Sequence, residues 1–157
     1  MIELTFTKPF RKINTEIYGD LKEVDVGDVC YHLFLGTVTF RLDGLDLSPD
    51  WGVLPVVDFA SAMLRVVEVL RTGRSEQFEY THSDDLIFFH TAGDGMVTIS
   101  SNYRPGRCIV GITEFCDAVD RMSFELLTFL REEHADIFGN TEFLDWYPGV
   151  RDFNRLN

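Results

Sequence analysis

The sequence predicts an α+β fold, in which an antiparallel meander of about six to seven strands packs against two main helices. Three observations predict it. Residues 55–71 and residues 113–138 carry apolar side chains at helical spacing. Between them lie short runs of alternating apolar and polar residues, separated by turn residues. Because the chain has 157 residues and no linker or repeat, we expect a single domain over residues 1–157.

The first residues are predicted to form a half-buried strand. Ile2, Leu4 and Phe6 alternate with polar residues, which is the pattern of a strand with one face on the core. The basic cluster Lys8–Lys12 interrupts this pattern, and its Pro9 lacks the N–H that a ladder needs. We therefore expect a loop or a sheet edge there.

The next segments are also interpreted as strands. Residues 14–28 mix acids with apolar residues, as strands on a solvated sheet face do. Residues 29–35 are almost all apolar and rich in β-formers, and residues 37–42 alternate. Gly36 between them is interpreted as a tight turn or as a bulge within one long strand.

Turn residues follow these strands. Asp43–Gly44 predicts a turn, and residues 48–52 predict a surface loop. For Trp51 in that loop we favour a role in covering the edge of the core over a role as an exposed contact residue, because large aromatics are usually buried.

The middle of the chain predicts one helix and then a meander. Pro55 suits the first turn of a helix, and Gly73 follows its last periodic residue, where a left-handed cap is favoured. Alternating runs then predict strands near residues 78–81, 97–100 and 108–112, and a continuous apolar run predicts one at residues 86–89. Residues 86–89 are apolar on both faces, which predicts a central strand. The short connections favour antiparallel pairing.

The longest periodic segment predicts a helix from Thr113, its expected N-cap, to about residue 138. Apolar residues cluster on one side of this helix and acids on the other. Phe124 does not fit, because its position places it among the polar residues. We favour a break near Ser123 or a second packing contact over an exposed aromatic. Gly139 and Asn140 end the helix, and the aromatic residues 146–147 are expected to pack back on the body.

The charge of the chain bounds its partners. Its 14 basic and 26 acidic side chains give a formal charge of −12, which disfavours nucleic acid and anionic membranes and favours a basic protein. Residues 113–157 hold 4 basic and 10 acidic residues, so half of the net charge lies there. Solubility alone explains the acidity equally well.

Cysteine usage and hydropathy suggest a location. The three cysteines leave one unpaired and include no Cys-x-x-Cys, so a reducing cytoplasm is expected. Cys30 and Cys116 lie in apolar patterns and are interpreted as inert core thiols. No apolar run approaches the ~20 residues that span a bilayer, so no membrane association is expected.

Histidines provide the only candidate chemistry. None of the four forms a zinc-helix motif, so no metal or cofactor is predicted, and no catalytic motif favours an enzyme. His82 with Asp84 could form a ligand site at a turn, joined by His90 if the strands pair as a hairpin. Solvated turn residues explain the same cluster, and we favour that interpretation.

The order of the segments also carries a resemblance. A β-rich N-terminal part precedes a helix containing residues Val57–Ala60, then a meander, then an acidic helix opened by residues Ile112–Phe115. In pattern and composition this order resembles small bacterial immunity-type proteins of polymorphic toxin systems. The resemblance implies a surface of acids and aromatics that blocks a toxin, and it transfers no functional residue.

Three functional hypotheses follow. The first is a cytoplasmic protein-binding domain that contacts a basic partner through Asp117, Asp120, Phe124 and Glu132. The second is a ligand-binding or enzymatic domain with a pocket near His82, Asp84 and His90. The third is a structural subunit that forms homo-oligomers through an uncovered sheet face or edge.

Overall fold

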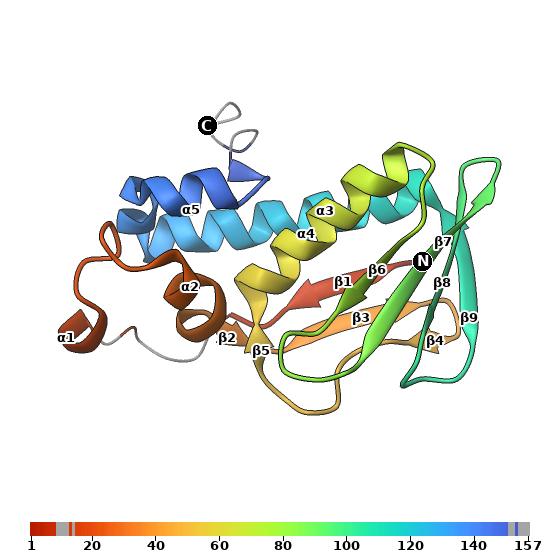
Figure 1. Cartoon of the computed structure of the whole chain (residues 1–157), viewed down its shortest axis with the longest axis horizontal. Helices are drawn as coiled ribbons and strands as arrows, with labels where there is room; N and C mark the ends of the chain where they lie inside the picture. The colour runs from red at the N-terminus through yellow and green to blue at the C-terminus, as the bar shows by residue number, and fades with distance from the viewer. Residues whose placement is uncertain (9–12, 14, 151–152, 154–157) are drawn as a thin grey trace.

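Helices and antiparallel strands share one buried core in this chain (Figure 1). The structure is a computed structural model that describes residues 1–8, 13, 15–150 and 153. The predicted loop at 8–12 therefore lies outside the described residues, except for Lys8. The α+β class is confirmed, with the described strands divided among three sheets rather than joined in one.

The predicted meander forms the largest sheet. It consists of β6 (Glu76–Glu79), β7 (Leu86–Gly93), β8 (Met96–Ser101) and β9 (Arg107–Gly111), in that order and antiparallel throughout. Ile87 and Phe89 on β7 and Val97 and Ile99 on β8 are fully buried, as alternation requires for the face on the core. The prediction that residues 86–89 form a central strand is confirmed, because β7 pairs on both sides.

Two smaller sheets come from the first third of the chain. One has the order β1 (Glu3–Phe6), β3 (Val38–Leu42), β4 (Leu45–Asp46), and the other pairs β2 (Leu35–Gly36) with β5 (Leu54–Pro55). The predicted turn at Asp43–Gly44 is confirmed, and Gly44 has a φ of +75°. Gly36 forms neither a turn nor a bulge. It lies in β2, where a Cβ would approach the Thr7 carbonyl oxygen to 2.5 Å, so the close backbone contact requires glycine there.

Two long helices, α3 (Val56–Arg71) and α4 (Ile112–Glu133), pack against each other at an oblique angle (Figure 1). The predicted helix at 55–71 is confirmed from Val56 onward, whereas Pro55 ends β5 and is the N-cap of α3. The predicted cap is confirmed, since Gly73 follows α3 with a φ of +78°. Phe115 of α4 lies 5.3 Å from Phe89 of the large sheet and 6.3 Å from Phe40 of β3, measured between ring centroids. The start of α4 therefore joins the two main sheets in one core.

The predicted break in the long helix is wrong. α4 is continuous from Ile112 to Glu133, with Gly111 rather than Thr113 as its N-cap. Ser123 is buried, and Phe124 packs edge-on against Phe153 with 5.3 Å between ring centroids. The alternative prediction is therefore the correct one: Phe124 makes an additional packing contact, with Phe153, while the helix continues unbroken. A 3-10 helix, η2 (Ala135–Gly139), and α5 (Thr141–Trp146) follow.

The strands predicted at 14–28 and 29–35 are mostly wrong. The described part of this region contains α1 (Thr15–Tyr18), α2 (Val26–Asp28) and a π-helix, η1 (Val29–Leu33), before the two-residue strand β2. The carboxylate of Asp25 accepts a hydrogen bond from the Gly27 N–H at 2.7 Å and caps α2. In η1 the buried residues are Val29, Cys30 and Leu33, which are spaced as on one face of a helix. The residue types of this segment nevertheless favour a strand.

Asn140 anchors this region to the C-terminal part of the chain. Its side-chain amide donates to the carbonyls of Leu21 at 3.0 Å and Val24 at 2.8 Å, and its oxygen accepts from the Phe143 N–H at 3.0 Å. The sequence predicts only that Asn140 ends a helix. The predicted docking of residues 146–147 is confirmed, because Tyr147 is 1% exposed.

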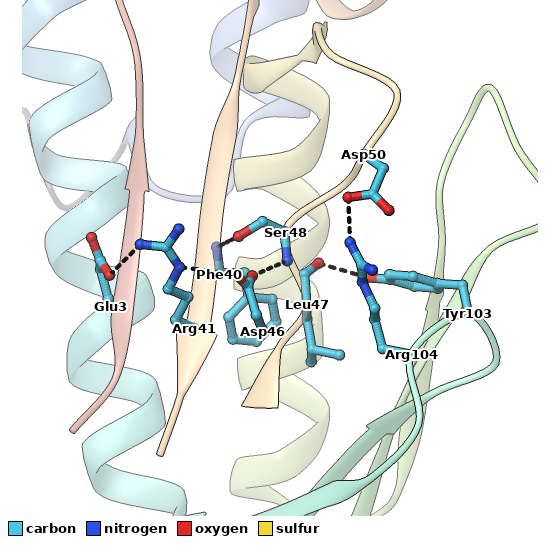
Figure 2. Close-up of polar contacts among 9 residues, drawn as sticks. All are labelled: Glu3, Phe40, Arg41, Asp46, Leu47, Ser48, Asp50, Tyr103 and Arg104. Atoms are coloured by element: carbon cyan, nitrogen blue, oxygen red, sulfur yellow. Dashed lines mark hydrogen bonds and ion pairs between the residues drawn. The ribbon is translucent and has the colours of Figure 1, made fainter. Parts of the chain in front are cut away.

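Polar contacts join the β1–β3–β4 sheet and the segment after β4 to the loop after β8 (Figure 2). The Tyr103 hydroxyl donates to the Leu47 carbonyl at 2.7 Å. Arg41 donates to Asp46 at 2.9 Å, and the Ser48 N–H donates to the same carboxylate at 2.9 Å. Hydrogen bonds from Ser48, followed by the contact with Arg41, lower the pKa of Asp46 to about 2. These polar groups hold the fold together and are already engaged with one another.

Candidate functional site

The four residues predicted to bind a partner all lie exposed on α4. Asp117 and Glu132 are separated by roughly 22 Å along the helix axis, at about 1.5 Å per residue. Phe124 lies between them and is 45% exposed. An aromatic ring that remains half in solvent on a helix otherwise packed on a core is typical of a contact surface.

Two of the four residues line a groove of about 550 Å³ between α3 and α4, the α3–α4 groove. They are Asp120 and Phe124; Asp117 and Glu132 lie outside it. The groove is lined by Leu64, Val67, Glu68 and Arg71 of α3, by Asp120, Arg121, Ser123, Phe124 and Leu127 of α4, and by Pro148, Gly149 and Phe153. Its volume is within the range that binds ligands or side chains of a partner.

The floor of the α3–α4 groove is apolar and its rim is charged. Leu64, Val67 and Leu127 are buried core residues whose outer surfaces reach the groove. On the rim, Arg71 of α3 donates to the Asp120 carboxylate of α4 at 3.1 Å. Because both side chains are about half exposed, this ion pair contributes only about 0–1 kcal/mol to stability.

The segment after α5 closes one end of the groove. The Ser123 and Tyr147 hydroxyls are 3.0 Å apart in a buried hydrogen bond, and burial raises the pKa of Tyr147. A Cβ on Gly149 would lie 2.8 Å from the Ser123 Oγ and 3.2 Å from the Leu64 Cδ1. The backbone at Gly149 therefore touches both helices, and glycine is required by that contact.

Most carboxylates of α4 have no ion-pair partner. The helix carries six acids and two arginines, a formal charge of −4. Asp120 pairs with Arg71, and Glu114 lies 3.7 Å from the N-terminal amine. Within the described part of the chain, no ion pair engages Asp117, Glu125, Glu132 or Glu133. The outer face of α4 therefore presents uncompensated negative charge around Phe124.

The alternative site is the turn between β6 and β7, residues 79–84, called here the His82 turn. His82 and Asp84 both line an open hollow of about 630 Å³ there. Nearby, the Thr81 hydroxyl donates to the Asp58 carboxylate at 2.6 Å. Burial raises the pKa of Asp58, and the hydrogen bond from Thr81 partly opposes that change. The turn thus brings polar groups together, and Asp58 already has a partner among them.

His90 is not brought to the His82 turn. The β6–β7 hairpin forms, but its register pairs Glu79 with Leu86 next to the turn and Glu76 with Phe89 at the far end. His90 follows Phe89 and stacks on Phe88, with 6.1 Å between ring centroids. The structure therefore unites two of the three residues proposed for the alternative site and separates the third.

Trp51 lies beside the His82 turn. Its ring packs edge-on against the buried ring of Tyr80, with 5.0 Å between centroids, and it remains 39% exposed. It covers the edge of the core, as predicted, and also leaves part of its own surface open. Its neighbours Pro55 and Asp58 form only a shallow depression with it.

The three cysteines are buried and free. Burial raises the pKa of the Cys30 thiol to about 12 and also raises the pKa of Cys116. The interpretation of both as core thiols is therefore confirmed by their burial. A group of three or more histidine, cysteine or acidic side chains placed to hold a metal ion does not occur in the described residues. No described helix combines the length and the apolarity that crossing a membrane requires.

Sequence reasoning missed the α3 side of the groove and its end. Leu64 was not singled out, and nothing in the sequence connects Arg71 with Asp120, 49 positions later. Gly149 and Phe153 follow a turn signal that points only to the end of a helix. The misplaced apolar residue Phe124 was the one signal that led to the groove.

The sequence matches no protein-family model, and neither a curated protein nor a solved structure shows significant similarity to the chain.

Proposed function

We propose that this chain is an acidic protein-binding domain, and that the outer face of α4 with the α3–α4 groove binds a basic protein. The observation that carries the proposal is Phe124, which is 45% exposed beside an apolar groove and among carboxylates that form no ion pair with a described residue. Aromatic residues surrounded by polar residues are typical of the centres of protein interfaces. Its burial by a partner would remove apolar surface from water, at about 25 cal/mol per Å².

Charge supports a basic partner. The formal net charge of the chain is −12. On α4, Asp117 and Glu132 form no ion pair with any described residue. Unpaired carboxylates raise the rate of encounter with a cationic surface, and salt screens this effect beyond about 10 Å at ~0.1 M. Asp120 is partly neutralised by Arg71, so we assign it to the rim of the groove and the steering role to Asp117 and Glu132.

We propose further that the partner is a toxin-type effector and that the setting is a bacterial cytoplasm, as the resemblance to immunity-type proteins implies. The support is the acidic face with an exposed aromatic ring, the surface that such inhibitors use. Burial of all three free cysteines agrees with a reducing compartment.

Affinity capture from the source cells tests the proposal. The wild-type chain is expected to retain a basic protein at about 0.05 M salt and to release most of it at about 0.5 M. Phe124→Ala and Asp120→Lys are expected to lose the partner, because one removes the aromatic contact and the other reverses a rim charge. His90→Ala, an exposed residue on the large sheet, is the matched control and is expected to retain it. Capture of no protein, or of one that ignores both salt and the two α4 substitutions, would contradict the proposal.

A second candidate is self-association through β9. This strand is at the edge of its sheet, and no described strand pairs with its outer side. Ile109 at its centre is 57% exposed. Exposed edge strands bind other strands readily. Sedimentation at several concentrations tests this candidate: a dimer abolished by Ile109→Lys supports it, and a monomer at every concentration contradicts it.

A further inference from the structure

We infer that the element of the partner that fills the α3–α4 groove is an amphipathic helix, with apolar residues toward the groove and basic residues along its flank. The inference rests on the proposed function and specifies which part of the partner is recognised. It follows from the spacing of the groove residues, from the absence of a free polar group on the floor, and from the distribution of charge around the rim.

The groove extends over two turns of each helix. On α3 its lining residues are spaced at i, i+3, i+4 and i+7, from Leu64 to Arg71. On α4 they span the same number of residues, from Asp120 to Leu127. Each span is about 10 Å long, at ~1.5 Å per residue. A third helix can place its own i, i+3, i+4 and i+7 side chains in such a groove, which is the usual way that helices pack and bind.

The chemistry of the floor favours apolar side chains over a polar small molecule. Among the described lining residues, the one buried polar side chain is Ser123, which already shares a hydrogen bond with Tyr147 at 3.0 Å. Sites for polar small molecules hold a few convergent polar groups that fix the orientation of the ligand. The floor offers instead the surfaces of Leu64 and Leu127 beside the ring of Phe124.

The groove also favours a helix over an extended peptide. Its walls are two α-helices, whose backbone groups bond within each helix, and the segment around Gly149. An extended peptide would therefore find no strand edge among the described residues of this groove, and its own N–H and C=O groups would stay unpaired there. A helix satisfies these groups internally and needs only side-chain contacts.

The carboxylates on and beside α4 indicate that the basic flank of the partner's helix faces α4. Arg71 is held by Asp120, so the rim charges without a described ion-pair partner are Glu68 and Arg121. Just outside the rim on α4 lie Asp117 and Glu125, two more carboxylates that form no ion pair with a described residue. The excess of acids attracts lysine and arginine residues beside the apolar stripe, and Arg121 disfavours a uniformly cationic helix.

Two synthetic peptides of identical composition test the inference. One arranges leucine and lysine as an amphipathic helix, and the other has the same residues permuted so that no apolar face forms. Binding is measured by NMR titration of the wild-type chain, of Phe124→Ala and of Val53→Ala. The last variant truncates another exposed apolar residue, but in the loop before β5, outside both proposed binding surfaces.

The inference expects the amphipathic peptide to bind about tenfold or more tighter than the permuted one, a difference of ~1.4 kcal/mol. Phe124→Ala is expected to lower this affinity about tenfold and Val53→Ala to leave it unchanged. Chemical-shift changes are expected to centre on Leu64 and Leu127.

Equal binding of the two peptides, shift changes confined to other surfaces, or binding of neither peptide would each overturn the inference. In all three cases salt-sensitive capture of a basic protein that depends on Asp120 would leave the proposed function standing. The two failures are therefore distinguishable.

Discussion

The α3–α4 groove, of which the sequence nominated only the α4 side, and the His82 turn are the two candidate surfaces, and they are built differently. The groove lies between two helices whose inner faces form the core, and its floor is apolar. The turn is a short connection whose hollow is lined by polar residues. At the groove Phe124 extends into solvent, whereas beside the turn Thr81 and Asp58 are bonded to each other.

This difference shows why clustered polar residues alone are a poor guide to function. Beside the His82 turn the Thr81 hydroxyl bonds to the Asp58 carboxylate, and His90 lies in β7 just beyond the residues that pair with β6. At the groove the surface has an exposed aromatic ring, and the nearby carboxylates of Asp117 and Glu125 form no ion pair with any described residue. Each prediction below tests one side of this contrast.

The largest effect is expected from Gly149→Ala, at the end of the groove. The new Cβ would lie 2.8 Å from the Ser123 Oγ and 3.1 Å from the Tyr147 Cε1, two buried groups with little room to move. We expect a loss of about 2 kcal/mol in the free energy of unfolding, typical of overpacking. Urea denaturation measures it.

Gly139→Ala is the matched control for that substitution. Its Cβ would also approach a neighbour to 2.8 Å, but the neighbour is Lys22, an exposed side chain that can swing away. We expect a loss below about 0.5 kcal/mol, as for most surface changes. Equal losses in the two variants would show that the segment around Gly149 is not packed tightly on the helices.

The second effect concerns the buried hydroxyl pair behind the groove. Ser123→Ala leaves the Tyr147 hydroxyl buried without its partner, and we expect a loss of about 1–2 kcal/mol. Ser83→Ala in the His82 turn removes a longer, partly exposed contact to Asp85 of 3.2 Å and is expected to cost less than about 0.5 kcal/mol. Thermal or urea unfolding of both variants compares the two regions directly. A larger loss in the turn would reverse the contrast.

The third prediction concerns pH and the carboxylate beside the turn. Because burial raises the pKa of Asp58 in the folded state, the folded chain binds this proton more tightly than the unfolded chain does. The resulting stabilisation is present below the unfolded pKa of about 3.9 and is lost as pH rises through the folded pKa. The stability of Asp58→Asn relative to wild type is therefore expected to increase as pH rises from about 3 to about 6.

Thr81→Val sharpens this test. The Thr81 hydroxyl donates to Asp58 and lowers the pKa that burial raises. Without it the pH dependence is expected to become steeper, as measured by urea unfolding at a series of pH values. A difference between Asp58→Asn and wild type that does not change with pH would contradict the assignment.

The smallest effect on stability is expected at the rim. Asp120→Asn removes an exposed ion pair with Arg71, and we expect a change of about 0.5 kcal/mol or less. The same variant is expected to weaken binding of a basic partner severalfold, so stability and binding separate. A large loss of stability with unchanged binding would assign Asp120 to the fold and not to the interface.

Local periodicity predicted much of the fold. α3 and α4 were found because residues such as Phe59 and Phe115 recur at helical spacing. The meander was found because the apolar run at 86–89 and alternating runs such as 97–100 are separated by turn residues. The π-helix η1 was missed because its residues are β-formers, and their helical burial pattern is too short to outweigh composition. Asp25, whose carboxylate caps α2 just before η1, was the local sequence signal that could have predicted a helix there.

The candidate site was predictable only in part. Phe124 and Asp120 were found from the wheel of one helix, because that information lies within α4. The α3 wall of the groove depends on contacts between residues far apart in the chain, such as Arg71 with Asp120 and Leu64 with Gly149. Strand register placed His90 away from His82, and register cannot be read from one sequence without a defined turn.

Site-specific photo-crosslinking tests the central claim most directly. A benzoylphenylalanine in place of Phe124, and in a second variant in place of His82, is introduced into the chain within its source cells. We predict a covalent adduct with a basic protein from position 124 and none from position 82. An adduct from position 82 alone, or from neither position, would contradict the claim that the acidic face of α4 is the surface through which this chain acts.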